Sequence, residues 1–183
     1  IQQDSVPIHA ALAVAAVTKR LIEEGIRLDV NLLVETASAR DPHHFAVLIG
    51  MGATAIYPYL ALQTINQLHL QNSFEIGMIA ARENYFISLK KSLLKILSKM
   101  GISTIASYRN AYLFEIIGLH QSVMDLCFYR CHSRIGGATF EDLHEDTLSN
   151  HQKAWNQNSY IQRSGQLKYV HGGEYHCYNP DVV

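Results

Sequence analysis

A strand–helix–strand pattern near the start of the chain constrains its fold more than any other feature. Arg27 to Glu35 mixes alternating with consecutive apolar residues, which is typical of a strand buried on most of both faces. Asp41 and Pro42 then predict the start of a short helix that ends at Gly50, and Ala53 to Tyr57 predicts a second strand. Because strands joined in this way are almost always parallel, we predict an α/β fold with a partial parallel sheet and flanking helices.

Apolar periodicity and glycine positions predict a helix-rich C-terminal half. A first helix should open near Ser5 to Pro7 and close at Gly25, and the longest should run from Ala80 to Met100. After it we expect a strand over Ile102–Ala106, an N-cap at Ser107, and helices over Tyr108–Ile117 and Gln121–Tyr129. Gly136-Gly137 predicts a break in regular structure. Thr139 and Asp142 then predict a capping box that opens a helix over Phe140–Trp155.

These patterns divide the chain into three segments. Residues 1–80 form an α/β core, and residues 81–156 form a helical segment. Residues 157–183 lack periodicity and contain several Gly and Tyr residues, so they are expected to be an irregular linker or the edge of a following domain.

Length, charge and cysteine content exclude several classes of protein. At 183 residues the chain suits one domain with a core of ordinary size. Its 15 Lys and Arg against 16 Asp and Glu give no cationic footprint for a nucleic acid. Apolar runs such as Ala10 to Val17 are too short to span a membrane, so no membrane partner is expected. Three cysteines suit a reducing, cytoplasmic compartment.

Because Ile1 stands where Met is usual, we expect a processed chain or a piece of a longer one.

The adjacent pair His43 and His44 follows the predicted N-cap at Asp41. Imidazoles at a helix N-terminus can polarise a carbonyl group or bind a metal ion. Neighbouring side chains on a helix point about 100° apart, so these two histidines cannot share one ion without distortion. We therefore expect them to act structurally at the helix start, with a ligand role as the lesser alternative.

Cys127 and Cys131 are four residues apart, which places two thiols on one helical face, and His132 follows directly. The spacing suggests a metal site, but further ligands at suitable spacing are missing nearby. We therefore expect these cysteines to be structural. Only the tertiary fold could add the remaining candidates, which are His171, His176 and Cys177.

Two further groups are weaker candidates. His144 and His151 lie on an acidic stretch without the HExxH spacing of zinc enzymes, and a solvated helix face explains them. Gly172 and Gly173, before Glu174, could present backbone N–H groups to an anion, but no nucleotide-binding pattern follows a strand. A nucleophile motif is absent as well. Spacing alone thus predicts no catalytic, cofactor-binding or metal-ligating residue.

Five stretches in serial order carry a family resemblance. They are HAALAVAAVTKRLIEEGIRLDVNLLVE at 9–35, HHFAVLIGMGATAIYPYLALQTI at 43–65, ENYFISLKKSLLKILSKMGISTIASYRNAYLFEIIGL at 83–119, SRIGG at 133–137 and GGEYHCYNPDVV at 172–183. Together they resemble the large subunit of glutamate synthase, in the later part of its central domain and the segment leading into its FMN-binding barrel. Agreement in this order is more specific than any single motif.

The resemblance implies a setting for the chain. In that family an N-terminal glutaminase domain releases ammonia, which joins 2-oxoglutarate at an FMN barrel, and electrons arrive through a 3Fe-4S cluster from NAD(P)H or ferredoxin. The central domain is an α/β connector without a catalytic step. Nothing in this chain resembles the glutaminase nucleophile, the FMN-binding strands or the cluster cysteines. FMN and the cluster are therefore expected in the full-length enzyme and not in this chain.

The chain also departs from the usual family text at particular positions. Met51 precedes Gly52, Tyr57 replaces an Asn, and Asn110 replaces a Gly. The exchange at position 110 is expected to cost little, because we place it in a helix and Asn forms helices better than Gly. The other departures are Tyr112 and the run Arg130, Cys131 and His132 before SRIGG.

We interpret the chain as a structural connector between the glutaminase and FMN-barrel domains of the same polypeptide. The alternative is a stand-alone, non-catalytic α/β interaction protein or a diverged gene fragment derived from that domain. An independent metal enzyme is the least favoured reading.

A segment cut from a larger domain leaves apolar faces uncovered. We therefore expect the isolated chain to self-associate unless its Tyr-rich segment, 160–178, covers these faces.

Overall fold

A computed structural model describes residues 3–73, 75–128, 130–156, 169–173, 179–180 and 182. The chain separates into two compact units, Ile1–Thr147 and Leu148–Val183. The expected boundaries near residues 80 and 156 concern domains of a larger protein and stay predictions.

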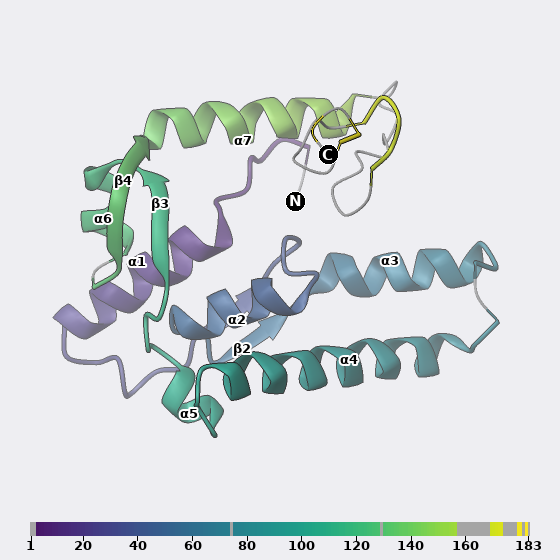
Figure 1. Cartoon of the computed structure of the whole chain (residues 1–183), viewed down its shortest axis with the longest axis horizontal. Coiled ribbons are helices and arrows are strands. Elements are labelled where there is room, and N and C mark those ends of the chain that lie inside the picture. The colour runs from purple at the N-terminus through teal and green to yellow at the C-terminus, as the bar shows by residue number, and fades with distance from the viewer. Residues whose placement is uncertain are drawn as a thin grey trace. The chain divides into compact units, whose positions relative to one another are not determined.

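The described residues form helices and short strands in a mixed α/β arrangement, as expected from the sequence (Figure 1). In chain order the elements are α1 (Ala10–Glu23), β1 (Leu33–Glu35), α2 (Pro42–Gly50), β2 (Ala55–Tyr57), α3 (Tyr59–Leu70), α4 (Met78–Lys99), α5 (Ile105–Tyr108), β3 (Glu115–Leu119), α6 (Gln121–Cys127), β4 (His132–Ala138) and α7 (Phe140–Trp155).

The first strand–helix–strand unit is confirmed, but its first strand is shorter than predicted. β1 and β2 pair in parallel, from Leu33 opposite Ala55 to Glu35 opposite Tyr57. Residues 27–32 do not join the strand, because the Arg27 guanidinium donates hydrogen bonds to the carbonyls of Val30 (3.1 Å) and Gly52 (2.6 Å) and folds this stretch into a turn. The expected burial on both faces is also wrong, since Val34 is the buried residue of β1.

A second strand–helix–strand unit replaces part of the predicted helical segment. β3 and β4 pair in parallel across α6, with register shifts between the paired positions. The predicted strand over Ile102–Ala106 is wrong, because the Thr104 side chain accepts a hydrogen bond from the Ser107 N–H and caps the short helix α5. Thr104, not Ser107, is thus the N-cap.

The predicted helix over Tyr108–Ile117 is also wrong, because left-handed backbone interrupts it. Asn110 has a φ of 61° and Tyr112 a φ of 50°, and such values end a right-handed helix. β3 follows instead. Gly136 and Gly137, expected to be a break, lie inside β4, where Gly137 allows β4 to approach the backbone of Gly118 in β3.

Most predicted helices are present. α1 starts later than expected: Pro7 precedes the helix, His9 is its N-cap, and Gly25 follows its end with a φ of 73°. α4 and α6 match the sequence within a few residues, and α7 opens with the predicted capping box of Thr139 and Asp142. α3 was not predicted.

The main core lies where α1, α2, α4 and α6 meet β1 and β2. Ala15 and Val123 in its centre are fully buried, and they come from α1 and α6, which contact each other although about a hundred residues separate them. α4 packs against α2 and α3, and Figure 1 shows α3 and α4 running side by side. A smaller cluster joins Ala46, Leu97 and Tyr108.

Candidate functional site

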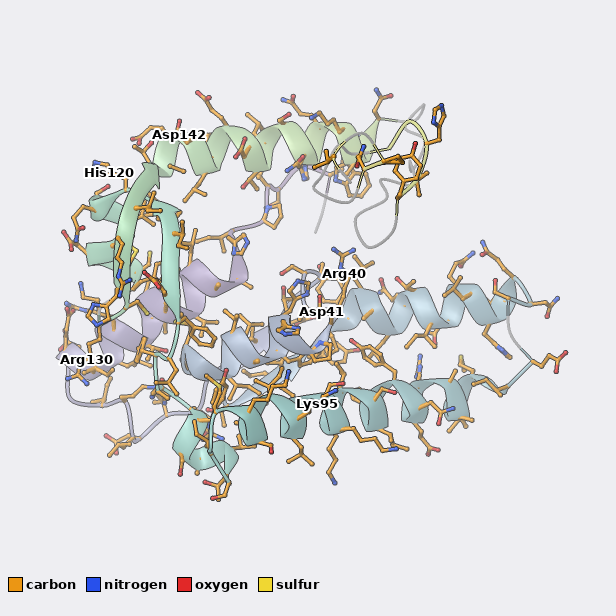
Figure 2. All side chains as sticks on the ribbon, in the orientation of Figure 1. Arg40, Asp41, Lys95, His120, Arg130 and Asp142 are labelled. Atoms are coloured by element: carbon orange, nitrogen blue, oxygen red, sulfur yellow. The ribbon has the colours of Figure 1, made fainter. Side chains whose placement is uncertain are left out.

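His43 and His44 lie at the start of α2 beside Asp41 (Figure 2). The Asp41 carboxylate accepts hydrogen bonds from the backbone N–H groups of His43 (2.8 Å) and His44 (3.2 Å). In return, His44 Nδ1 accepts from the backbone N–H groups of Arg40 (3.2 Å) and Asp41 (3.5 Å). This reciprocal arrangement is a capping box in which the imidazole satisfies helix-start donors. His44 therefore has the structural role expected for it.

The cysteines have environments that suppress thiolate chemistry. Cys127 is buried in the main core at the end of α6, and Cys131 is partly buried against the same core. Burial raises the pKa of both thiols above the ordinary value, and the nearby Lys19 opposes this only partly at Cys127. A thiol is a nucleophile or metal ligand only when ionised. His132 is exposed at the start of β4, and His176 and Cys177 lie outside the described residues.

The remaining predicted candidates do not converge on one site. His144 is exposed on α7, His151 contacts the ring of Trp155, and Asp142 is engaged in the capping box. The hydrogen bonds from Thr139 hold the pKa of Asp142 below its usual range. Within the described residues, no three His, Cys, Asp or Glu side chains gather as a metal site would require. Gly172 has a φ of 76° in a turn, and Glu174 lies outside the described residues.

A cleft lies beside β1. It has a volume of about 550 Å³ and lies between the start of α1 and residues 32–38 around β1. Its walls include exposed apolar side chains, among them Ile8 (71% exposed) and Leu33 (72%). Of its lining residues, His9, Glu35 and Tyr59 are ionisable, and the others are apolar or uncharged. The cleft therefore suits an apolar polypeptide surface better than a charged small molecule.

The open edge of β1 faces this cleft. The carbonyl of Leu32 accepts from the N–H of Ala55 (3.2 Å), and the N–H of Thr36 donates to the carbonyl of Tyr57 (3.1 Å). Hydrogen bonding alternates along a strand, so the peptide groups of Leu33 and Glu35 point to the side away from β2. No described strand pairs with β1 on that side. An open strand edge is a surface that readily binds another chain segment.

The β3–β4 sheet presents a second uncovered surface. Ile117 and Ile135 face each other in register and are 65% and 58% exposed. Ile116 and Leu119, on the same strand β3, pack against the main core. The ends of the two strands are joined by an ion pair between Arg134 Nε and Glu115 Oε1 (3.3 Å). Parallel sheets are normally covered on both faces, whereas this apolar pair is mainly exposed. We call Ile117 and Ile135 the sheet pair.

Sequence reasoning expected uncovered apolar faces but did not predict which residues form these two surfaces. The apolar pattern over Arg27 to Glu35 predicts a strand buried on most of both faces, and the pattern over β3 predicts a helix. The signal for the sheet pair was the motif SRIGG, whose Gly137 allows close strand approach. A smaller hollow of about 320 Å³ near Arg130, Cys131 and Ser133 was not foreseen either.

Comparison with known proteins now identifies the family. Residues 1–120 match the glutamate synthase central domain. The chain belongs to the glutamate synthase central domain family. This agrees with the resemblance seen in the sequence.

The curated relatives are far longer than this chain. It is 41% identical to ferredoxin-dependent glutamate synthase 1 of Arabidopsis thaliana, with 97% of this chain and 12% of the relative aligned. It is 38% identical to the glutamate synthase [NADPH] large chain of Bacillus subtilis, with 97% and 12% aligned, and 39% identical to glutamate synthase [NADH] of Saccharomyces cerevisiae, with 93% and 8% aligned. The chain thus corresponds to a segment of a glutamate synthase.

The family departures have distinct structural settings. Met51 is buried after α2, and Tyr57 is half exposed at the end of β2. Asn110 and Tyr112 lie in the left-handed stretch before β3, and Arg130 has a φ of 75° just before Cys131.

Among the helices of the described residues, none has the length and apolar character that a membrane span requires. The expected cytoplasmic location stays a prediction, since the Arabidopsis relative is named as chloroplastic or mitochondrial.

Proposed function

We propose that this chain acts as a non-catalytic connector in a glutamate synthase, between the glutaminase domain and the FMN-binding domain of the same polypeptide. The observation that supports it most is the pair of uncovered apolar surfaces, the β1 cleft and the sheet pair, in a chain that aligns with 12% of its long relatives. Surfaces of this kind on a soluble protein mark contacts with other polypeptide surfaces.

The proposed mechanism is positional. Reactions that pass an intermediate between two centres depend on the separation and orientation of those centres. In this chain the parallel strand pairs β1–β2 and β3–β4, connected through α2 and α6, hold the β1 cleft and the sheet pair as fixed apolar surfaces. Domains that cover these surfaces would be held in a defined orientation.

The cofactors of the family fit other parts of the enzyme better than this one. Iron–sulfur clusters are held by Cys thiolates, whereas Cys127 is buried in apolar surroundings and burial raises the pKa of Cys127 and Cys131. These two thiols do not suit a cluster. The proposed role therefore includes no flavin or electron-transfer step by residues of this chain.

A chimeric enzyme tests the proposal. The aligned segment of the Bacillus subtilis large chain is replaced by this complete chain, and glutamate formation from 2-oxoglutarate is measured with glutamine and with added ammonia. We expect the chimera to use both. Ile117→Asp with Ile135→Asp should lower the glutamine-dependent rate more than the ammonia-dependent rate, because the surface that orients the neighbouring domain is disrupted.

Leu70→Asp provides the control, because Leu70 is 74% exposed at the end of α3, outside both surfaces. Equal effects of the double variant and of Leu70→Asp on the ratio of the two rates would contradict the proposal. So would a folded chimera that uses ammonia but never glutamine. That second result is the one expected of a stand-alone interaction protein or a diverged fragment.

A further inference from the structure

α4 carries an exposed face that is both apolar and basic. Ile87 and Leu94 lie seven residues apart and are 49% and 51% exposed, while Leu89 on the opposite side is buried. Exposed lysines share the stripe with the apolar pair, at the helical spacing of three and four residues. We call this stripe the α4 basic face; its residues are Ile87, Lys90, Lys91, Leu94 and Lys95. Figure 2 labels Lys95 on this helix.

Within the described residues, no ion pair neutralises the positive charge of this face. Lys90, Lys91 and Lys95 take part in none of the ion pairs within the described residues. α2 and α3, which pack against α4, contain no Asp or Glu. The acidic residue of α4 itself is Glu83, one turn before Ile87. Since the whole chain has a formal net charge of -1, the face is a local concentration of cations.

The stability of α4 does not account for this arrangement. A lysine is favourable near a helix C-terminus, but the effect is confined to the last turn, where Lys99 lies. Lys91 and Lys95 are four residues apart, and like charges at this spacing destabilise a helix. Ile87 and Leu94 are half exposed and belong to neither hydrophobic core cluster. The face is thus better explained by an intermolecular contact than by folding.

We infer that the α4 basic face docks an acidic protein surface with an apolar centre. Carboxylates of such a partner would pair with Lys90, Lys91 and Lys95, while its apolar side chains would cover Ile87 and Leu94. Opposite charges accelerate and orient association, and the apolar centre contributes buried area. A polyanion such as a nucleic acid would use the lysines without the aliphatic pair. The inference does not rest on the proposed function, because α4 contributes to neither the β1 cleft nor the sheet pair.

The test uses the full chain and a synthetic probe. The probe is a blocked helical peptide with leucine at every seventh position and glutamate on both sides of that line, and binding is measured by fluorescence anisotropy. We expect saturable binding that weakens when salt rises from about 0.05 M to about 0.5 M, because exposed charges are screened. Lys95→Glu should weaken binding by about tenfold or more, and Leu94→Ser should also weaken it.

Matched variants separate a specific contact from net charge or stickiness. Lys153→Glu makes the same charge change on an exposed lysine of α7, and Leu126→Ser removes a leucine that is 56% exposed on α6; both should leave binding unchanged. A peptide with lysine in place of glutamate should bind the variant Lys91→Glu with Lys95→Glu and not the natural chain. These results together would support the docking surface.

Three results would overturn the inference. One is the absence of saturable binding to the glutamate peptide by the natural chain while circular dichroism shows it folded. Another is equal weakening by Lys153→Glu and Lys95→Glu. The third is preferential, Lys95-dependent binding to vesicles of phosphatidylserine and phosphatidylcholine, which would assign the face to a lipid surface.

Discussion

At the scale of single residues, the contact between α1, the end of α2 and the loop before β3 is the most constrained place in the chain. Gly52 has a φ of 122°, and a Cβ there would collide with Thr18 Oγ1 and Asn110 Oδ1. Asn110 itself is left-handed, with a φ of 61°. The helix expected at position 110 was therefore the wrong context for judging the family exchange of Gly for Asn. Asparagine is tolerated here because it adopts left-handed backbone more readily than other non-glycine residues.

The backbone at position 110 gives a direct stability prediction. Asn110→Gly should change the free energy of unfolding by less than about 1 kcal/mol, since glycine adopts this conformation freely and the buried Asn110 Oδ1 has no hydrogen-bond partner to lose. Asn110→Val should destabilise the chain by about 1–3 kcal/mol, because a β-branched residue is strained at positive φ. Urea unfolding of the three proteins measures both values. A valine variant as stable as the natural chain would contradict the left-handed assignment.

The buried thiols give a prediction of pH dependence. Because burial raises the pKa of Cys127 and Cys131, both stay protonated at pH values where a free thiol has begun to ionise. In the native chain, maleimide or iodoacetamide should label Cys127 much more slowly than in the urea-unfolded chain, and labelling should rise only at higher pH. The raised native pKa also means that the thiols contribute stability that is lost as pH rises above about 9. Peptide mapping by mass spectrometry follows each cysteine, and fast native labelling of Cys127 near pH 7 would contradict the burial.

At the scale of elements, helices could be predicted from local sequence signals, whereas strand formation depended on contacts between residues far apart in sequence. The start of α2 could be predicted because Asp41 and Pro42 act within one turn, and the start of α7 because Thr139 and Asp142 do the same. β3 could not, since its apolar residues also fit a helix and its strand geometry depends on pairing with β4, whose first residue lies beyond α6. The β1 cleft was missed for a similar reason. It arises from where α1 lies beside β1, which no local pattern encodes.

The capping geometry at α2 predicts different stability effects for substitution of the two histidines. His44→Ala should lower the free energy of unfolding by about 0.5–2 kcal/mol, because its ring accepts hydrogen bonds at the helix start. His43→Ala should stay within about 0.5 kcal/mol, since its side chain is exposed and its backbone N–H still binds Asp41. Chemical denaturation measures stability, and atomic emission measures bound metal before and after each change. Metal that is bound by the natural chain and lost in both variants would favour the ligand role.

Two neighbouring glycines of β4 form a natural pair of test and control. A Cβ at Gly137 would collide with backbone atoms of Gly118, whereas a Cβ at Gly136 would meet open space. Gly137→Ala should therefore destabilise the chain by about 1–3 kcal/mol, and Gly136→Ala should have little effect. Thermal unfolding followed by circular dichroism compares the two variants. Equal melting temperatures would show that β3 and β4 do not approach as closely as described.

At the scale of the whole molecule, family membership and the presence of uncovered apolar faces were predictable, while the side chains that form those faces were not. Ordered agreement over stretches such as KMGISTIASYR identified the family without any structural information. Uncovered apolar area cannot be read in this way, because a leucine in a strand looks the same in sequence whether its face is covered or open. Leu33 and Ile117 illustrate this, since both occupy strands and both are mainly exposed.

We expect the natural chain to bind neither FMN nor an iron–sulfur cluster. Purified protein should be colourless after desalting, because the thiols of Cys127 and Cys131 are held protonated by burial and do not suit an iron–sulfur cluster. Absorption spectra from 300 to 600 nm, taken with and without added FMN, provide the measurement. A stoichiometric flavin or iron–sulfur spectrum that survives desalting would overturn this prediction.

The contact between α1 and α6 has a consequence for synthesis on the ribosome. The strand pairs β1–β2 and β3–β4 each join segments close in sequence and can form as soon as they emerge. The main core cannot close until Val123 reaches Ala15. At ~5–20 residues per second, the part of α1 that packs on α6 stays uncovered for roughly 5–20 s after it has been made. During that interval the nascent chain resembles a chaperone substrate, so sensitivity to chaperone depletion should depend on α6 more than on either sheet.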